Sequence, residues 1–119
     1  MSKINLITVN IHETDSSAID EYMSSVWNMV ATVREFNPHV VAITVSPWRN
    51  GDYQIIFDVS SETVALVKAN GLGATEKAFF DHEWTDGYDF VRIVPASEVN
   101  AYVEIMRLLI NYWNEHLAK

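Results

Sequence analysis

The residues of this chain best suited to chemistry are gathered in one segment, 79–90. It interleaves large aromatic side chains with carboxylates, and no Lys or Arg occurs between Lys77 and Arg92. The pair Asp86-Gly87 near its middle is typical of a tight hairpin turn. Such a ribbon presents negative charge beside flat apolar surface, as a protein that docks on a basic partner would.

Two interpretations of this acidic segment stay open. In the first, the carboxylates speed the encounter with a basic protein, while the aromatic residues supply apolar contact area. In the second, the segment is an ordinary edge hairpin whose charges discourage edge-to-edge aggregation. The docking hypothesis assigns partner binding to Asp81, Glu83, Trp84, Asp86, Tyr88 and Asp89.

The same residue types suggest a metal site, but their spacing disfavours one. Adjacent residues of a strand point to opposite sides, so His82 cannot easily join Asp81 and Glu83 around one ion. The chain has no cysteine, which excludes disulfides and thiolate chemistry. None of its 4 histidines stands in a motif with a nucleophile. We therefore expect no catalytic residue, no metal and no cofactor, and a protein that is not an enzyme.

The charge balance narrows the classes of partner. The 119 residues include 16 acids and 8 bases, for a formal net charge of −8. Nucleic-acid and lipid phosphates would repel such a surface, so we expect no direct nucleic-acid partner and no membrane partner. A basic protein fits better, although acidity also serves solubility alone. The N-terminus lacks the apolar core of a signal peptide and no window approaches a membrane span, which indicates a cytoplasmic protein.

Hydrophobic periodicity predicts the elements that must position the acidic segment. Residues 4–11 are apolar on both faces, which is typical of a central strand. Asn50-Gly51 predicts a type I′ turn, with Thr44 opposite Phe57 in the two strands that it joins. The predicted elements after the first strand are a helix over 17–36, a hairpin of 39–48 and 53–60, a short helix from Ser60 or Ser61 to Asn70, a second hairpin of 75–84 and 88–94, and a last helix from 97 nearly to 119.

This order, β-α-β-β-α-β-β-α, predicts an α+β fold. We expect a mainly antiparallel sheet of about five strands, with two long helices and one short helix. The order is partly ferredoxin-like, a topological match that implies no function. With no repeat or long linker, the 119 residues should form a single compact domain, 1–119. Trp27, Met29 and Phe36 broaden the apolar face of the first helix, which favours side-by-side packing of the two long helices.

The last helix carries more apolar surface than packing on one sheet requires. Beside its main stripe runs a second row with 4-3-4 spacing, formed by Ala101, Ile105, Leu108 and Tyr112. This row either meets another chain, as in a homodimer, or is covered by the first long helix or a loop of the same chain. Both alternatives stay open at this point.

The sequence favours a small acidic non-enzymatic binding protein that inhibits a basic protein target by electrostatic and steric blocking. The analogy is with immunity proteins and phage antagonists as a functional class, and it rests on no family resemblance. One alternative is a ferredoxin-like homodimer that binds a small molecule between sheet and helices, in a cavity lined by Tyr22, Trp27 or Trp113. Another is a structural or assembly protein that uses the last helix.

Overall fold

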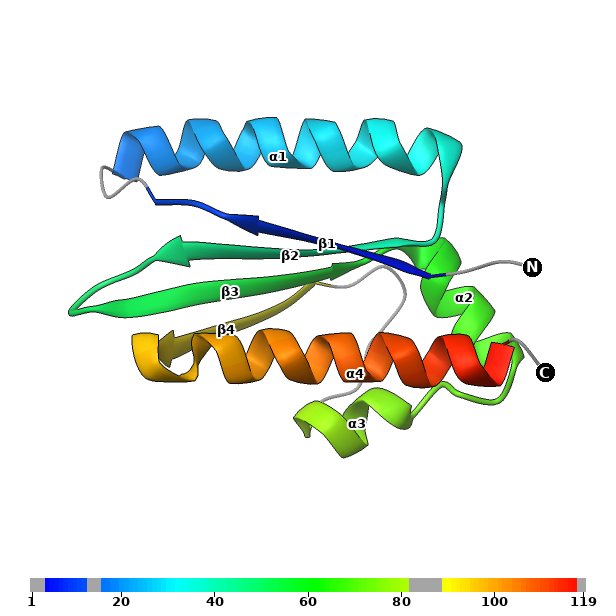
Figure 1. The fold of residues 1–119 in the computed structure, drawn as a ribbon. Coiled ribbons are helices and arrows are strands. Elements are labelled where there is room, and N and C mark those ends of the chain that lie inside the picture. Colours follow the sequence, from blue (N-terminus) through cyan, green and yellow to red (C-terminus); the bar gives the residue numbers. More distant parts are fainter. Residues whose placement is uncertain (1–3, 13–15, 82–88, 118–119) are drawn as a thin grey trace.

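The computed structural model describes residues 4–12, 16–81 and 89–117 (Figure 1). The predicted α+β class is confirmed: within these residues a mixed sheet of four strands is combined with helices. Along the chain the elements are β1 (Asn5–Asn10), α1 (Ser16–Phe36), β2 (Val40–Pro47), β3 (Asp52–Val59), α2 (Ser61–Ala69), α3 (Thr75–Phe80), β4 (Asp89–Pro95), the 3₁₀ helix η1 (Ala96–Glu98) and α4 (Val99–Leu117).

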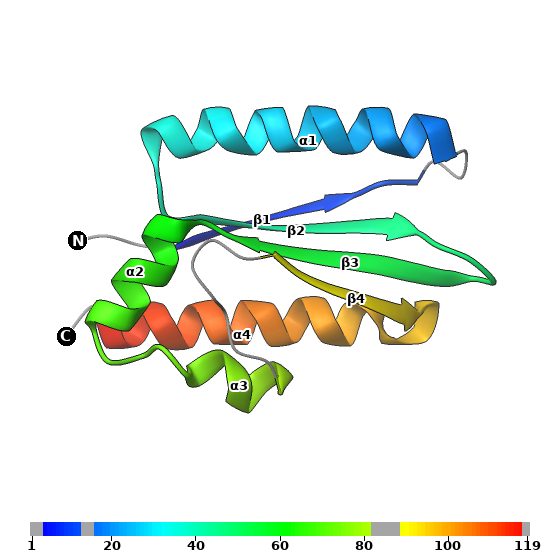
Figure 2. The same ribbon diagram turned by 180° about the vertical axis from the view of Figure 1, so that it is seen from behind.

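The strands lie in the sheet in chain order, β1-β2-β3-β4. β1 runs parallel to β2, while β2 with β3 and β3 with β4 form antiparallel pairs. α1 lies over one face of the sheet, and α4 lies over the opposite face together with α2 and α3 (Figure 1 and Figure 2). The sheet is therefore the middle of three layers, and each of its faces has its own core.

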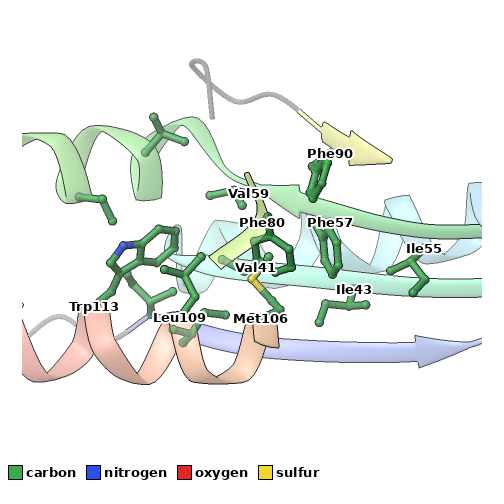
Figure 3. Packing of buried hydrophobic residues seen from close by; sticks show 14 of the residues in the cluster. Val41, Ile43, Ile55, Phe57, Val59, Phe80, Phe90, Met106, Leu109 and Trp113 are labelled. Carbon is green, nitrogen blue, oxygen red and sulfur yellow. The ribbon is translucent and has the colours of Figure 1, made fainter. Parts of the chain in front are cut away.

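The larger core lies between the sheet and α4. Trp113, Leu109 and Met106 point from α4 toward the strands (Figure 3), and their exposed fractions are 1%, 0% and 0%. β2 and β3 send alternate residues to this face, as a pleated strand must. These strand residues are Val41, Ile43 and Val45 from β2 and Ile55, Phe57 and Val59 from β3. Removing so much apolar surface from water is the main force that holds these layers together.

The smaller core lies between α1 and the sheet. Val26 and Val30 pack on Ala42 of β2, and Val9 of β1 contacts this cluster. Near the start of α1, Met23 packs with Ile56 and Ile11. The deeply buried part of α1 is thus a narrow stripe, placed mainly over β1 and β2.

Local signals define several element ends as predicted. α1 ends at Phe36 because Asn37-Pro38 follows, and the residue before a proline avoids the helical region. The Ser60 hydroxyl caps α2 by accepting a hydrogen bond from the Thr63 amide at 3.2 Å. Gly71, just after α2, has a φ of 77°, a conformation that glycine adopts at little cost.

The prediction that the first strand is central is wrong. β1 forms one edge of the sheet and pairs with β2 alone among the described strands. It nevertheless has apolar residues on both sides because each face of the sheet is covered: Leu6 packs against the α4 core, and Val9 contacts the α1 core. Apolar residues on both faces of a strand therefore report two covered faces rather than a central position.

The register predicted for the first hairpin is wrong by one residue. Asn50-Gly51 has the two positive φ angles of a type I′ turn, 56° and 80°, as expected. The Trp48 amide, however, donates to the Asp52 carbonyl at 2.9 Å, so three residues rather than two link the strands. Phe57 consequently pairs with Ile43, the residue before its predicted partner. A one-residue shift exchanges the two faces of a strand, and here it collects the large apolar residues on the α4 side.

The prediction of a fifth strand over 75–84 is wrong for its first part. Residues Thr75–Phe80 form α3, and 82–84 lie outside the described residues. Helical spacing buries Glu76 and Phe80 together, with exposed fractions of 1% and 5%, whereas Lys77 is exposed. Phe80 reaches the core, where its ring centroid lies 5.1 Å from that of Phe57. A helix of 6 residues is too short to show a convincing periodicity in sequence.

The two long helices do not pack side by side. They are separated by the sheet (Figure 1), so neither covers the apolar residues that broaden the other. Phe36, Trp27 and Met29 of α1 remain 85%, 49% and 41% exposed. This arrangement leaves more apolar surface accessible than side-by-side packing would.

One buried hydrogen bond connects α3 to α4 and gives a stability prediction. The Trp113 indole N–H donates to the Thr75 hydroxyl at 2.6 Å. Thr75→Val leaves this N–H unpaired in the core, so the free energy of unfolding should fall by about 1–3 kcal/mol in chemical denaturation. Adding Trp113→Phe to Thr75→Val removes both partners, so the double variant should lose less than the sum of the two single losses. Thr32→Val, at an exposed position of α1, is the control and should change stability by less than about 0.5 kcal/mol. Additive losses would contradict the pairing.

Candidate functional site

The structure describes only part of the predicted acidic segment. Asp81 is exposed and ends α3 in the left-handed conformation, with a φ of 53° and its amide donating to the Lys77 carbonyl at 2.8 Å. Asp89 begins β4, where its Cα pairs with that of Asp58. The remaining predicted partner-binding residues, Glu83, Trp84, Asp86 and Tyr88, lie outside the described residues. The segment thus joins the end of α3 to the start of β4.

The second row of the last helix is partly covered by its own chain. Tyr112 packs on Phe79 of α3, with ring centroids 6.2 Å apart, and Ile105 also packs against the α4 core. Ala101 is exposed, and Leu108 is 46% exposed. The covering element is α3, which the sequence analysis had taken for a strand. The exposed remainder of the row is small.

A groove separates α1 from the hairpin of β2 and β3, and it was not predicted at this place. Its volume is about 680 Å³, within the range of ordinary ligand sites. We call it the α1 groove. Its lining combines aromatic, apolar and polar side chains, of which Asp20, Trp27, Ser46, Trp48, Gln54 and Ile56 carry its chemistry.

The strand side of the α1 groove contains polar groups without protein partners. Ser46 is only 2% exposed, yet within the described part of the chain its hydroxyl makes no hydrogen bond. The side-chain amide of Gln54, which is half-buried, makes none there either. Ile56, 8% exposed, supplies apolar surface beside them. Both side chains line the groove with hydrogen-bonding capacity to spare, so they can meet a polar group of a ligand.

Two indoles form the aromatic part of the α1 groove. Trp27 comes from α1 and is 49% exposed, while Trp48 comes from the end of the hairpin and is 47% exposed. The guanidinium of Arg49 lies over the Trp48 ring, 5.7 Å from its centroid. Asp20 lines the groove seven residues before Trp27, on the same side of α1. Aromatic faces and a carboxylate are groups that attract cations.

The apolar floor of the α1 groove continues onto the neighbouring edge strand. Val91 and Ile93 of β4 pair with Ile56 and Gln54 of β3, and they are 48% and 41% exposed. We call Val91 and Ile93 the open face. No described helix lies over β4 on this side of the sheet, because α1 is placed over β1 and β2 (Figure 1).

Of the three aromatic residues expected to line a cavity, one lines the α1 groove. That residue is Trp27. Tyr22 lines a separate hollow of about 470 Å³ between α1 and β1. Trp113 belongs to the core, and the space beside it measures about 10 Å³, too small for a ligand. In the sequence, the helical spacing of Asp20 and Trp27 was readable, but the strands they would face were not.

The guanidinium of Arg34 anchors the end of α1 to the sheet. Its Nε and Nη2 donate to the Val40 carbonyl at 3.0 and 2.8 Å. Nη2 also donates to the Asp58 carbonyl at 3.0 Å, and Nη1 donates to the Asp58 carboxylate at 3.3 Å. These bonds hold the C-terminal end of α1 to β2 and β3.

The Arg34 anchor can be tested with Arg34→Lys. An ammonium group cannot reproduce the planar set of donors, so the free energy of unfolding should fall by about 1–3 kcal/mol in chemical denaturation. Arg107→Lys is the matched control. Arg107 hydrogen-bonds to Glu104 and lowers the pKa of that carboxyl below its ordinary value, but both side chains are exposed. Such surface pairs contribute little, so the control should change stability by less than about 0.5 kcal/mol. Equal losses in the two variants would contradict the anchoring role of Arg34.

Comparison with known proteins found no matching family model, no similar curated protein and no similar solved structure. Within the described residues, no three His, Asp or Glu side chains come together as a metal site. None of the described helices is both long and apolar enough to cross a membrane. The function of this chain must therefore be inferred from its own charges, grooves and exposed surfaces.

Proposed function

We propose that this chain is a small acidic non-enzymatic binding protein that inhibits or neutralises a basic protein by electrostatic and steric blocking. The observation that carries the proposal is that, in the described residues, most arginine side chains are paired within the chain whereas many carboxylates are not. The guanidinium groups are largely engaged within the chain, Arg34 by Asp58, Arg107 by Glu104, and Arg92 by the rings of Phe90 and Tyr102.

Many carboxylates, by contrast, face solvent without a counter-ion. Within the described part of the chain, the exposed acids that form no salt bridge are Asp20, Glu21, Glu35, Glu62, Asp81, Glu98 and Glu115. Their charge is therefore not cancelled locally, and together with the net charge of −8 it produces a negative potential over the surface. A negative potential attracts basic proteins and repels nucleic acid and anionic lipid.

The proposal places contact with the partner at Asp81, Glu83, Trp84, Asp86, Tyr88 and Asp89. The strand that follows this segment supports it, because β4 exposes Val91 and Ile93 directly after Asp89. Exposed apolar residues next to a charged segment provide both parts of a protein interface, a hydrophobic centre and a charged rim. The same contact would block the partner sterically.

The α1 groove favours a second candidate function, the binding of a small molecule between sheet and helices. Its volume of about 680 Å³, its two indoles and its unpartnered polar groups are properties of ligand pockets. Native mass spectrometry of the protein isolated from its source tests this candidate. A retained non-peptide ligand would favour it over the inhibitor. The assembly role of α4 has less support, since α3 covers part of the row that it needs.

The role of the acidic segment can be tested on a partner captured from the native host and eluted with salt. Replacing Asp81, Glu83, Asp86 and Asp89 by their amides should slow association with this partner about tenfold or more at low ionic strength, because electrostatic steering is lost. Stopped-flow fluorescence measures the rate.

The matched control removes the same charge from other exposed positions. Glu35, Glu62, Glu98 and Glu115 are replaced by Gln, which leaves the segment intact. This variant should associate clearly faster than the segment variant, since local charge acts within a Debye length of about 10 Å. Equal rates for both variants would remove the segment from the mechanism, and capture of no basic protein would count against the proposed function itself.

A further inference from the structure

We propose that the α1 groove binds an arginine side chain of the basic partner. The proposal rests on the proposed function and adds to it the chemical group that the partner must present. Its basis is the combination, in one groove, of a carboxylate, two half-exposed indoles and polar side chains that make no hydrogen bond within the described residues.

The aromatic walls favour a flat cation. The faces of Trp27 and Trp48 are half-exposed, and indole is the best aromatic partner for a cation. The chain itself gives an example, because the guanidinium of Arg49 already lies 5.7 Å from the centroid of the Trp48 ring. A guanidinium stacks on such a face more readily than an ammonium, since it is planar and more weakly hydrated.

The polar groups of the groove complement the donors of arginine. Asp20 is exposed and has no salt-bridge partner in the described part of the chain. The Ser46 hydroxyl and the Gln54 carbonyl oxygen are further acceptors, and neither receives a hydrogen bond there. A guanidinium has five N–H donors and no acceptor, so it can use several acceptors at once. Arg49 also lines the groove and competes with an incoming cation for Trp48, so the preference rests on Asp20 and on the number of acceptors, which favours arginine over lysine.

The position of the groove suits a side chain presented by a protein. It opens beside the open face, where Val91 and Ile93 offer apolar surface for the residues that flank the arginine. An occupant with an arginine between apolar residues would therefore bury the open face together with the groove. A free cation would leave the open face exposed.

The probe is the capped peptide Ac-Ala-Leu-Arg-Leu-Ala-NH2, with a matched peptide in which citrulline replaces arginine. Citrulline keeps the shape and removes the charge. The arginine peptide should shift the indole N–H signals of Trp27 and Trp48 in ¹H–¹⁵N NMR spectra, while the buried Trp113 signal stays in place. The affinity of the citrulline peptide should be lower by a factor of about ten or more, since a charge-assisted hydrogen bond is lost. Equal binding of the two peptides, or of a lysine peptide, would overturn the assignment of a guanidinium.

Substitutions test whether the peptide binds in the groove. Asp20→Asn should weaken arginine-peptide binding about tenfold, whereas Glu35→Gln, an equal loss of charge on α1, should leave it within about twofold. Trp27→Ala should weaken binding, and Phe36→Ala, which removes an aromatic residue that is 85% exposed on the same helix, should not. Arg49→Gln removes a competing cation from Trp48 and should tighten binding about threefold. Weaker binding of the Arg49 variant, or equal effects of Asp20→Asn and Glu35→Gln, would overturn the proposal.

The groove proposal and the proposed function fail in different ways. If the captured basic partner binds Asp20→Asn and Trp27→Ala as tightly as the original protein, the groove assignment is wrong and the proposed function stands. If no basic protein is captured although the arginine peptide binds in the groove, the proposed function is wrong and the groove remains an arginine site.

Discussion

The placement of α1 over the sheet is the constraint on which the exposed surfaces of this protein depend. The guanidinium of Arg34 holds the end of α1 to the Val40 carbonyl and to Asp58. Asn37-Pro38 then ends the helix and leads the chain directly into β2. With its end held there, α1 lies mainly over β1 and β2, contacts β3 at Ile56, and leaves the open face of β4 accessible. On the opposite side of the sheet, α4 lies together with α2 and α3 (Figure 2).

Two kinds of surface therefore come together on one part of the molecule. The α1 groove supplies aromatic faces and unpartnered acceptors, and the open face extends it as apolar surface to β4. The acidic segment enters the same strand at Asp89. The pairing of arginine side chains within the chain completes the arrangement, because it offsets part of the positive charge while several carboxylates stay exposed and unpaired. An acidic surface with an apolar centre is suited to a basic protein partner, since charge guides the encounter and apolar burial supplies affinity.

The local features of the fold were predictable because short-range chemistry determines them. Only a few neighbouring residues determine where α1 ends, at Asn37-Pro38, and where α2 ends, at Gly71. The same holds for the Ser60 cap and for the Asn50-Gly51 turn. The α+β class followed from the order of these elements. Features that depend on tertiary contacts were mispredicted. The apolar residues on both faces of β1 predict a central strand, but β1 lies at an edge, and the six residues of α3 show no clear period from which a helix could be predicted.

The α1 groove illustrates why the site was harder to predict than the fold. A single extra residue in the loop after Trp48 shifts the β2–β3 register and thus decides that Ser46 and Ile56 face α1. The helical spacing of Asp20 and Trp27 was visible in the sequence, but not which face of the sheet their helix would cover. The acidic segment, in contrast, was identified from composition alone. Its assignment to partner binding stays a prediction, since most of it lies outside the described residues.

Hydrogen–deuterium exchange of the protein, free and bound to its captured basic partner, tests most directly which surface meets that partner. We expect slower exchange in the complex for the first half of α1, for the β2–β3 loop and for the segment that leads into β4, with the exposed side of α4 unchanged. Protection centred on α4 around Leu108, with no change at the α1 groove or in residues 81–93, would contradict this expectation.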